Sequence, residues 1–129
     1  MKKIFYFIMV MFIVSSCAYE IIDSKPGESV NPVTNLNYTV SGSDVTLTWD
    51  LPTFYPDDII QPVSVFIKVI KDGQAAGTFV VEDSPVTYTF TGYDETEVYR
   101  FTVKVQANVN TDDPNLSELR YSLGNTIEI

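Results

Sequence analysis

Apolar and polar side chains alternate along most of the chain after residue 31. The clearest stretch runs from Tyr99 to Ala107, where every second residue is apolar and the residues between are Arg, Thr, Lys and Gln. Because successive side chains of a β-strand point to opposite faces of its sheet, this pattern predicts a strand with one buried face. Beyond the first 14 residues, no run of ten residues has the spacing of an amphipathic helix.

Six further segments alternate in the same way. The apolar positions expected to face the core are Leu36, Tyr38 and Val40; Val45, Leu47 and Trp49; Val63, Val65, Ile67 and Val69; Phe79 and Val81; Val86, Tyr88 and Phe90; and Leu123, Ile127 and Ile129. Turn-forming residues separate them, at 41–44, 71–73, 83–85, Gly92 and Pro114. Seven short strands in about a hundred residues predict an all-β sandwich.

The N-terminus shows a different pattern. Two lysines at positions 2 and 3 are followed by eleven apolar or aromatic residues, 4–14, and then by two serines and Cys17. At about 1.5 Å per residue, a helix of that length reaches about 16 Å, half of the ~30 Å hydrocarbon core of a bilayer. This arrangement predicts a signal peptide over residues 1–16 rather than a membrane-spanning helix.

The segment Val14-Ser-Ser-Cys17 resembles the lipobox of bacterial lipoproteins, which implies that Cys17 is acylated and becomes the new N-terminus. The alternative is cleavage at an ordinary small-residue site, which would leave Cys17 as a free thiol. Ala18 stands where inner-membrane retention signals usually place Asp, so the resemblance implies the outer membrane of a Gram-negative bacterium. Glu20 and Asp23 resemble a surface-export signal, which favours the cell surface slightly over the periplasmic face.

Residues 17–31 show little periodicity and contain charged residues, Pro and Gly, so we expect an acylated Cys followed by a flexible linker. The folded domain is expected over residues 32–129. With Cys17 acylated, this domain has no cysteine for a disulfide, and its hydrophobic core alone must hold it together.

Composition narrows the function. The chain of 129 residues has 8 basic and 17 acidic residues, a formal charge of −9 and no His. Such a charge argues against a nucleic-acid partner. The lack of His excludes Ser-His-Asp and Cys-His catalysis and His-ligated zinc. A small sandwich with short loops also offers little concavity for a pair of catalytic carboxylates, so we expect no enzyme.

Residues 32–129 resemble a fibronectin type III domain. The positions that carry the resemblance are Pro32 and Leu36, Trp49 followed by Pro52, and Tyr93 six residues before Tyr99. The resemblance implies a seven-stranded, immunoglobulin-like sandwich in which Trp49 is a core ring and Tyr99 hydrogen-bonds backbone at the corner before its strand. The chain departs from the family in having Tyr93 where Leu is usual. Other immunoglobulin-like bacterial domains remain an alternative, and the fold implies binding or spacing rather than a particular ligand.

In this topology, three acidic loops are expected at the end where the first strand begins. The residues considered for a ligand or a weak calcium site there are Tyr55, Asp57, Asp58, Asp83, Asp112 and Asp113. Carboxylates are ligands for Ca²⁺, and an aromatic ring can stack on a sugar. The alternative is that these loops are polar because they are solvated, since no EF-hand spacing is present.

A second candidate is the outer face of the sheet that contains the third and sixth strands. Its outward positions include Phe66, Lys68, Arg100 and Lys104, which suit a protein partner or an anionic glycan. Alternatively, Phe66 only covers the aliphatic stems of Lys68 and Arg100.

We therefore expect a non-catalytic envelope lipoprotein that is attached to the membrane through Cys17 and binds a protein or glycan. The alternative is a structural spacer or accessory subunit of an outer-membrane complex, without a ligand of its own.

Overall fold

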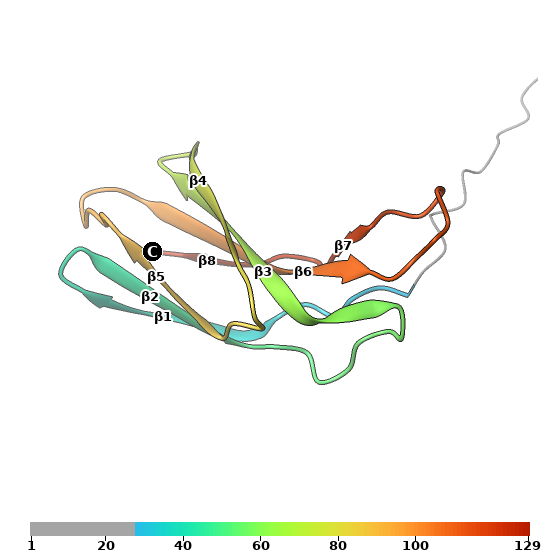
Figure 1. Cartoon of the computed structure of the whole chain (residues 1–129). Helices are drawn as coiled ribbons and strands as arrows, with labels where there is room; N and C mark the ends of the chain where they lie inside the picture. Colours follow the sequence, from blue (N-terminus) through green and yellow to red (C-terminus); the bar gives the residue numbers. More distant parts are fainter. Residues whose placement is uncertain (1–27) are drawn as a thin grey trace, which may run out of the picture.

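The computed structural model describes residues 28–129, which form two antiparallel β-sheets packed face to face (Figure 1). The strands are β1 (Thr34–Ser41), β2 (Asp44–Asp50), β3 (Ile59–Lys71), β4 (Gln74–Val81), β5 (Thr87–Thr91), β6 (Tyr99–Val109), β7 (Leu119–Tyr121) and β8 (Asn125–Glu128). One sheet has the order β1-β2-β5 and the other the order β4-β3-β6-β7, with β8 also paired to β6. The expected all-β sandwich is confirmed.

The leader and Cys17 lie outside the described residues, so the predictions of a signal peptide and of acylation stay predictions. Within residues 28–129, no helix is long and apolar enough to cross a membrane.

The centre of the core consists of the inward positions of β3 and β6. Val65, Ile67 and Val69 lie opposite Val105, Val103 and Phe101, and all six are fully buried. These residues pack with Val45, Leu47 and Trp49 of β2 in one hydrophobic cluster. The alternation that predicted the three strands therefore reports their buried faces correctly.

Trp49 is a core residue, as expected. Its side chain is 3% exposed, and its indole N–H donates a hydrogen bond of 2.9 Å to the carbonyl oxygen of Pro85. The ring thereby satisfies its one polar group while it fills the space between the sheets, which is the usual condition for burying a tryptophan.

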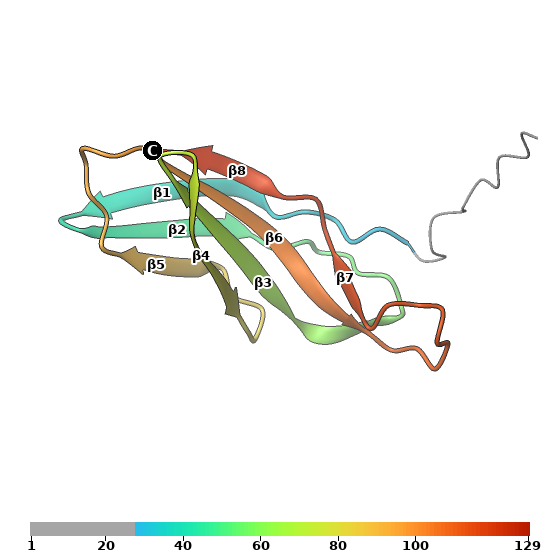
Figure 2. The ribbon, with the colours of Figure 1, turned by 90° about the horizontal axis from the view of Figure 1, so that it is seen from above.

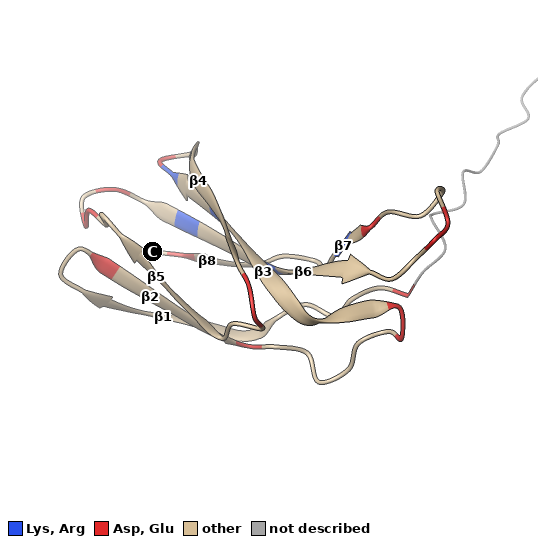
Figure 3. Cartoon of the chain, viewed as in Figure 1, with Lys and Arg blue, Asp and Glu red and all other residues tan. Residues whose placement is uncertain are grey.

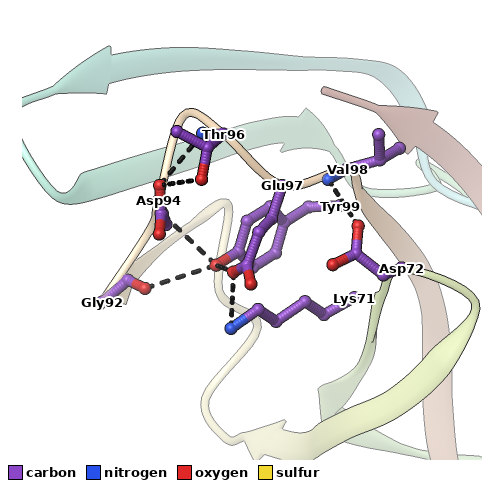
Figure 4. Close-up of polar contacts among 8 residues, drawn as sticks. All are labelled: Lys71, Asp72, Gly92, Asp94, Thr96, Glu97, Val98 and Tyr99. Atoms are coloured by element: carbon purple, nitrogen blue, oxygen red, sulfur yellow. Dashed lines mark hydrogen bonds and ion pairs between the residues drawn. The ribbon is translucent and has the colours of Figure 1, made fainter.

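Tyr99 forms the expected corner at the start of β6 (Figure 4). Its hydroxyl oxygen accepts a hydrogen bond of 3.2 Å from the backbone N–H of Asp94, and the hydroxyl donates to the carbonyl oxygen of Gly92 at 3.4 Å. Because Tyr99 is 1% exposed, these bonds fix the β5–β6 loop against the core.

The turn between β3 and β4 is attached to the same loop (Figure 4). Asp72 and Gly73 both have positive φ, 50° and 78°, as a two-residue hairpin turn of the favoured type requires. Asp72 donates its N–H to the carbonyl of Val98 at 2.8 Å, and its carboxylate accepts the N–H of Val98 at 3.0 Å. An ion pair between Lys71 and Glu97 lies beside these bonds.

The last predicted strand, over residues 123–129, corresponds to β8, whereas β7 is an additional strand that was not predicted. The expectation that Leu123 faces the core is wrong. Leu123 is 80% exposed, whereas the preceding Ser122 is buried. The hydroxyl of Ser122 accepts a hydrogen bond of 2.9 Å from the N–H of Val105, and the N–H of Ser122 donates to the carbonyl of Val105. This side-chain bond replaces a regular backbone bond, which interrupts the strand and changes which residues face inward.

Three other apolar positions expected in the core are exposed. Tyr38 and Val40 of β1 are 36% and 45% exposed, and Val86, which precedes β5, is 53% exposed. β1 is an edge strand, and the strand of the second sheet that it contacts, β8, has only four residues. The opposite sheet therefore covers this edge incompletely.

The packed chain begins earlier than the expected boundary at Pro32. Val30 and Val33 are 3% and 1% exposed and belong to the hydrophobic cluster. The segment that precedes β1 thus closes one end of the sandwich.

Candidate functional site

The outer face of the β4-β3-β6-β7 sheet is not covered by any element of the described chain (Figure 2). The four predicted residues Phe66, Lys68, Arg100 and Lys104 alternate with fully buried ones on β3 and β6, so all four lie on this face. Two of them, Lys68 and Arg100, are exposed. The sequence therefore correctly predicted that these four residues lie on one face of the sheet.

Lys104 lies between two aromatic rings on this face. Its Nζ is 4.8 Å from the centroid of the Phe66 ring and 4.5 Å from the centroid of the Tyr121 ring. The two rings meet edge to face, with centroids 6.1 Å apart and an angle of 82° between their planes. A cation this close to an aromatic face is attracted by the ring quadrupole, so the rings hold the ammonium group in place. We call Phe66, Lys104 and Tyr121 the Lys104 cluster.

Phe66 does more than cover the aliphatic stems of Lys68 and Arg100, which was the alternative role expected for it. Its ring contacts the ammonium group of Lys104. Arg100 instead pairs with Glu128 on β8, at 3.1 Å.

Tyr121 was not among the predicted residues of this face, although it is 44% exposed. Leu119 and Tyr121 do alternate with Arg120, and that pattern was the available signal. Tyr121 reaches the face because it lies opposite Gln106 in the pairing of β7 with β6.

The cations of the molecule are distributed unevenly over its acidic surface (Figure 3). Residues 28–129 contain 5 basic and 15 acidic residues. Three of the five basic residues are ion-paired: Lys71 with Glu97, Arg100 with Glu128 and Arg120 with Asp58. In this part of the chain, the two basic residues without an ion pair are Lys68 and Lys104, and both lie on the outer face of the second sheet.

The three acidic loops expected at one end are only partly brought together. The β2–β3 and β6–β7 loops are joined by a hydrogen bond of 2.8 Å from the N–H of Asn110 to the carbonyl of Asp58. The β4–β5 loop is instead bound to β3, through the N–H of Ser84 and the carbonyl of Val63. Among residues 28–129, no group of three His, Cys, Asp or Glu side chains could hold a metal ion.

Individual residues of this end are engaged in other ways. Asp58 accepts two hydrogen bonds from the guanidinium of Arg120, at 2.9 and 2.7 Å, so both of its carboxylate oxygens are in use. Tyr55 packs against the core, and burial raises the pKa of its hydroxyl. The remaining candidates, Asp57, Asp83, Asp112 and Asp113, are exposed. Calcium binding by these loops stays a prediction, and Asp58 would have to leave Arg120 to take part.

The Asp58–Arg120 pair makes stability depend on pH in a defined direction. The hydrogen bonds from Arg120 lower the pKa of Asp58 below its ordinary value, and the same bonds raise the pKa of Arg120. A depressed carboxyl pKa contributes stability above the unfolded value of about 3.9, and the contribution is lost as pH falls through the folded pKa.

We therefore expect Asp58→Asn to lower the melting temperature at neutral pH and the difference from the wild type to shrink below about pH 4. Thermal denaturation from pH 7 to pH 2.5 measures this difference. Asp57→Asn is the matched control, because Asp57 is the exposed neighbour and is not part of an ion pair in residues 28–129. A difference that stays constant over this pH range would contradict the assignment.

A shallow hollow lies at the opposite end, between the β1–β2 turn and the β5–β6 loop. Its lining residues are Gly42, Ser43, Tyr93, Asp94 and Glu95. Asp94 is engaged within its own loop, where hydrogen bonds from the backbone N–H and the hydroxyl of Thr96 lower the pKa of its carboxyl. The lining contains the acidic residues Asp94 and Glu95 and no basic residue.

Comparison with known proteins supports the fold. A family model described as "Domain of unknown function (DUF4945)" matches residues 17–129. The crystal structure of an FN3 domain of human collagen XX is similar to 82% of this chain and 99% of that chain, with 16% sequence identity and a TM-score of 0.50. A structure described as "Myokine structure" is similar to 78% of this chain and 96% of that one, with 13% identity and a TM-score of 0.45. No curated protein matches the sequence.

Proposed function

Since the chain belongs to the family described as "Domain of unknown function (DUF4945)" and folds as a fibronectin type III-like sandwich, we propose that it is a non-catalytic envelope lipoprotein that binds a protein or a glycan. The fold itself suggests a binding or scaffold module, and no enzyme family is indicated. Binding would take place on the outer face of the β4-β3-β6-β7 sheet.

The Lys104 cluster is the observation that carries this proposal. It places a cation without an ion pair in residues 28–129 between two aromatic rings, on a face that the described chain leaves uncovered. Aromatic residues are enriched at the centres of interfaces, where they contribute much of the binding energy. Exposed apolar surface continues across this sheet, since Tyr121 of β7 is 44% exposed and Val80 of β4, which lies opposite Phe66, is 50% exposed.

The lipoprotein part of the proposal rests on the sequence. The family match begins at residue 17, the residue that the lipobox predicts as the first of the mature chain. We place the protein in the outer membrane, at the cell surface rather than the periplasmic face, because of the residues that follow Cys17. The lipid would tether the sandwich at the end where Val30 and Val33 enter the core, which leaves the side faces of both sheets accessible.

A pull-down from native envelope with the full-length lipoprotein in detergent tests the binding function. The double variant Lys104→Gln with Tyr121→Ala is expected to retain about tenfold less of the captured component, because it removes the cation and its exposed ring. Phe54→Ala is the matched control: Phe54 is an aromatic residue, 60% exposed, in the β2–β3 loop.

Equal capture by the wild type and the double variant, with both folded by circular dichroism, would contradict binding through this face. Capture of nothing by the wild type would favour the structural spacer or accessory subunit instead.

A further inference from the structure

The charge of the outer face of the second sheet is opposite to that of the rest of the molecule. The whole chain has a formal charge of −9, yet the two basic residues of residues 28–129 that lack an ion pair, Lys68 and Lys104, are both on this face. Among the residues of β3, β6 and β8 that lie on this face, Glu128 is the one acidic residue. Its carboxylate forms an ion pair with Arg100. Charge complementarity therefore selects an anionic partner.

The two free cations are neighbours. Phe66 lies opposite Lys104 and Lys68 lies opposite Thr102, so Lys68 and Lys104 are diagonal neighbours on adjacent strands. Diagonal positions are about 7–8 Å apart, within the combined reach of two lysine side chains. Two anionic groups of one extended ligand can therefore be bound at the same time, one by each ammonium group.

The face also carries neutral polar side chains. Ser64, Thr102, Gln106 and Thr126 lie on it together with the apolar Ile70 and Val80, and all four polar residues can donate and accept hydrogen bonds. Aromatic rings beside neutral polar groups suit a sugar, which has an apolar C–H face and a rim of hydroxyl groups. An extended peptide is usually recognised at a free strand edge or in a groove, whereas these residues lie on the face of a sheet, so the geometry favours a sugar over an acidic peptide.

Resting on the proposed binding function, we propose that the ligand of this face is an acidic polysaccharide that carries carboxylate groups. Lys68 and Lys104 bind two of its carboxylates, and the exposed ring of Tyr121 contacts the apolar face of a sugar residue. Binding is electrostatic in large part, so it weakens as salt is added.

The test uses the full-length lipoprotein in detergent and three probes: polygalacturonate, dextran and poly-glutamate of similar length. We expect binding of polygalacturonate, no binding of dextran and at least about tenfold weaker binding of poly-glutamate, measured by isothermal titration calorimetry. The double variant Lys68→Gln with Lys104→Gln should weaken polygalacturonate binding by about tenfold or more, because it removes both charge-assisted contacts. Tyr121→Ala should also weaken it.

The double variant Arg100→Gln with Glu128→Gln is the matched control. It removes both members of the ion pair on the same face and leaves the net charge of the face unchanged, so its effect on affinity should be less than about twofold. Thermal denaturation checks that every variant is folded.

Equal affinity for poly-glutamate and polygalacturonate would overturn the polysaccharide assignment in favour of an acidic protein, and the proposed binding function would stand. A loss on the Arg100→Gln, Glu128→Gln double variant as large as that of the double lysine variant would show that binding does not depend on the two lysines in particular and would also overturn the site. If no anionic probe binds while the envelope pull-down still depends on the Lys104 cluster, this inference fails alone. If both experiments give no binding, the proposed function fails with it.

Discussion

Replacing Trp49 with alanine is expected to lower the free energy of unfolding by about 3–5 kcal/mol, the usual cost of truncating a buried aromatic side chain. Trp49 is 3% exposed and lies between the sheets, and its removal also leaves the carbonyl of Pro85 without its 2.9 Å hydrogen bond. Domains of this size have a total stability of about 5–15 kcal/mol, so the variant should be at or near the limit of folding. Urea denaturation followed by far-ultraviolet circular dichroism measures the change.

Two further variants separate the contributions. Trp49→Phe keeps most of the ring but loses the hydrogen bond to Pro85, so it should cost clearly less than the alanine variant. Phe54→Ala truncates an aromatic side chain that is 60% exposed and should cost little. A Trp49→Ala variant within about 1 kcal/mol of the wild type would mean that the ring does not hold the two sheets together.

The sequence predicted the central strands well because each of them has one face buried in the core and one face toward solvent. β3 and β6 lie in the interior of their sheet, with strands paired on both sides, so each has one face against the core and one toward solvent. That arrangement produces the strict alternation that runs through Val65, Ile67 and Val69 and from Tyr99 to Val105. The identity of the corner tyrosine also followed from the family resemblance, and its hydrogen bonds to backbone are present.

Prediction was poorer at the sheet edges, where alternation does not measure how much of a strand the other sheet covers. Tyr38 and Val40 alternate as the core strands do, but the opposite sheet covers β1 incompletely, so both residues are exposed. At Leu123 the cause is a single side chain: the Ser122 hydroxyl binds the backbone of Val105 and shifts the phase of the strand. A bond between a serine and a residue 17 positions away leaves no periodic signal.

The two candidate sites differed in predictability for a similar reason. Phe66 and Lys104 were predicted on one face because strand alternation fixes the face of each residue. Tyr121 was missed because its place depends on the register of β7 against β6, which follows a loop over residues 110–118. Asp58 was considered as a metal ligand because sequence shows acidic loops, but it does not show that Arg120, 62 residues later, binds both carboxylate oxygens.

Replacing Cys17 with serine is expected to abolish fatty-acid incorporation and to move the protein out of the detergent phase. The prediction rests on the segment Val14-Ser-Ser-Cys17 at the end of an eleven-residue apolar run, outside the residues that the structure describes. Burial of an acyl chain contributes about 0.8 kcal/mol per CH₂ group, and one chain alone gives only marginal binding, so stable attachment needs the several chains of a mature lipoprotein. Labelled palmitate followed by Triton X-114 partition measures both effects.

Ser16→Ala is the control, because it keeps a small residue before the cysteine and should leave the label and the detergent partition unchanged. Serine at position 17 cannot form the thioether that carries the lipid, so a Cys17→Ser protein that still incorporates palmitate would show attachment at another residue and would refute the lipobox interpretation.

Protease treatment of intact cells then separates the two locations: digestion of the wild-type domain indicates the cell surface, and protection until the outer membrane is permeabilised indicates the periplasmic face. Only a surface-exposed domain could bind an extracellular acidic polysaccharide, so protection would confine the ligand of the Lys104 cluster to the periplasm.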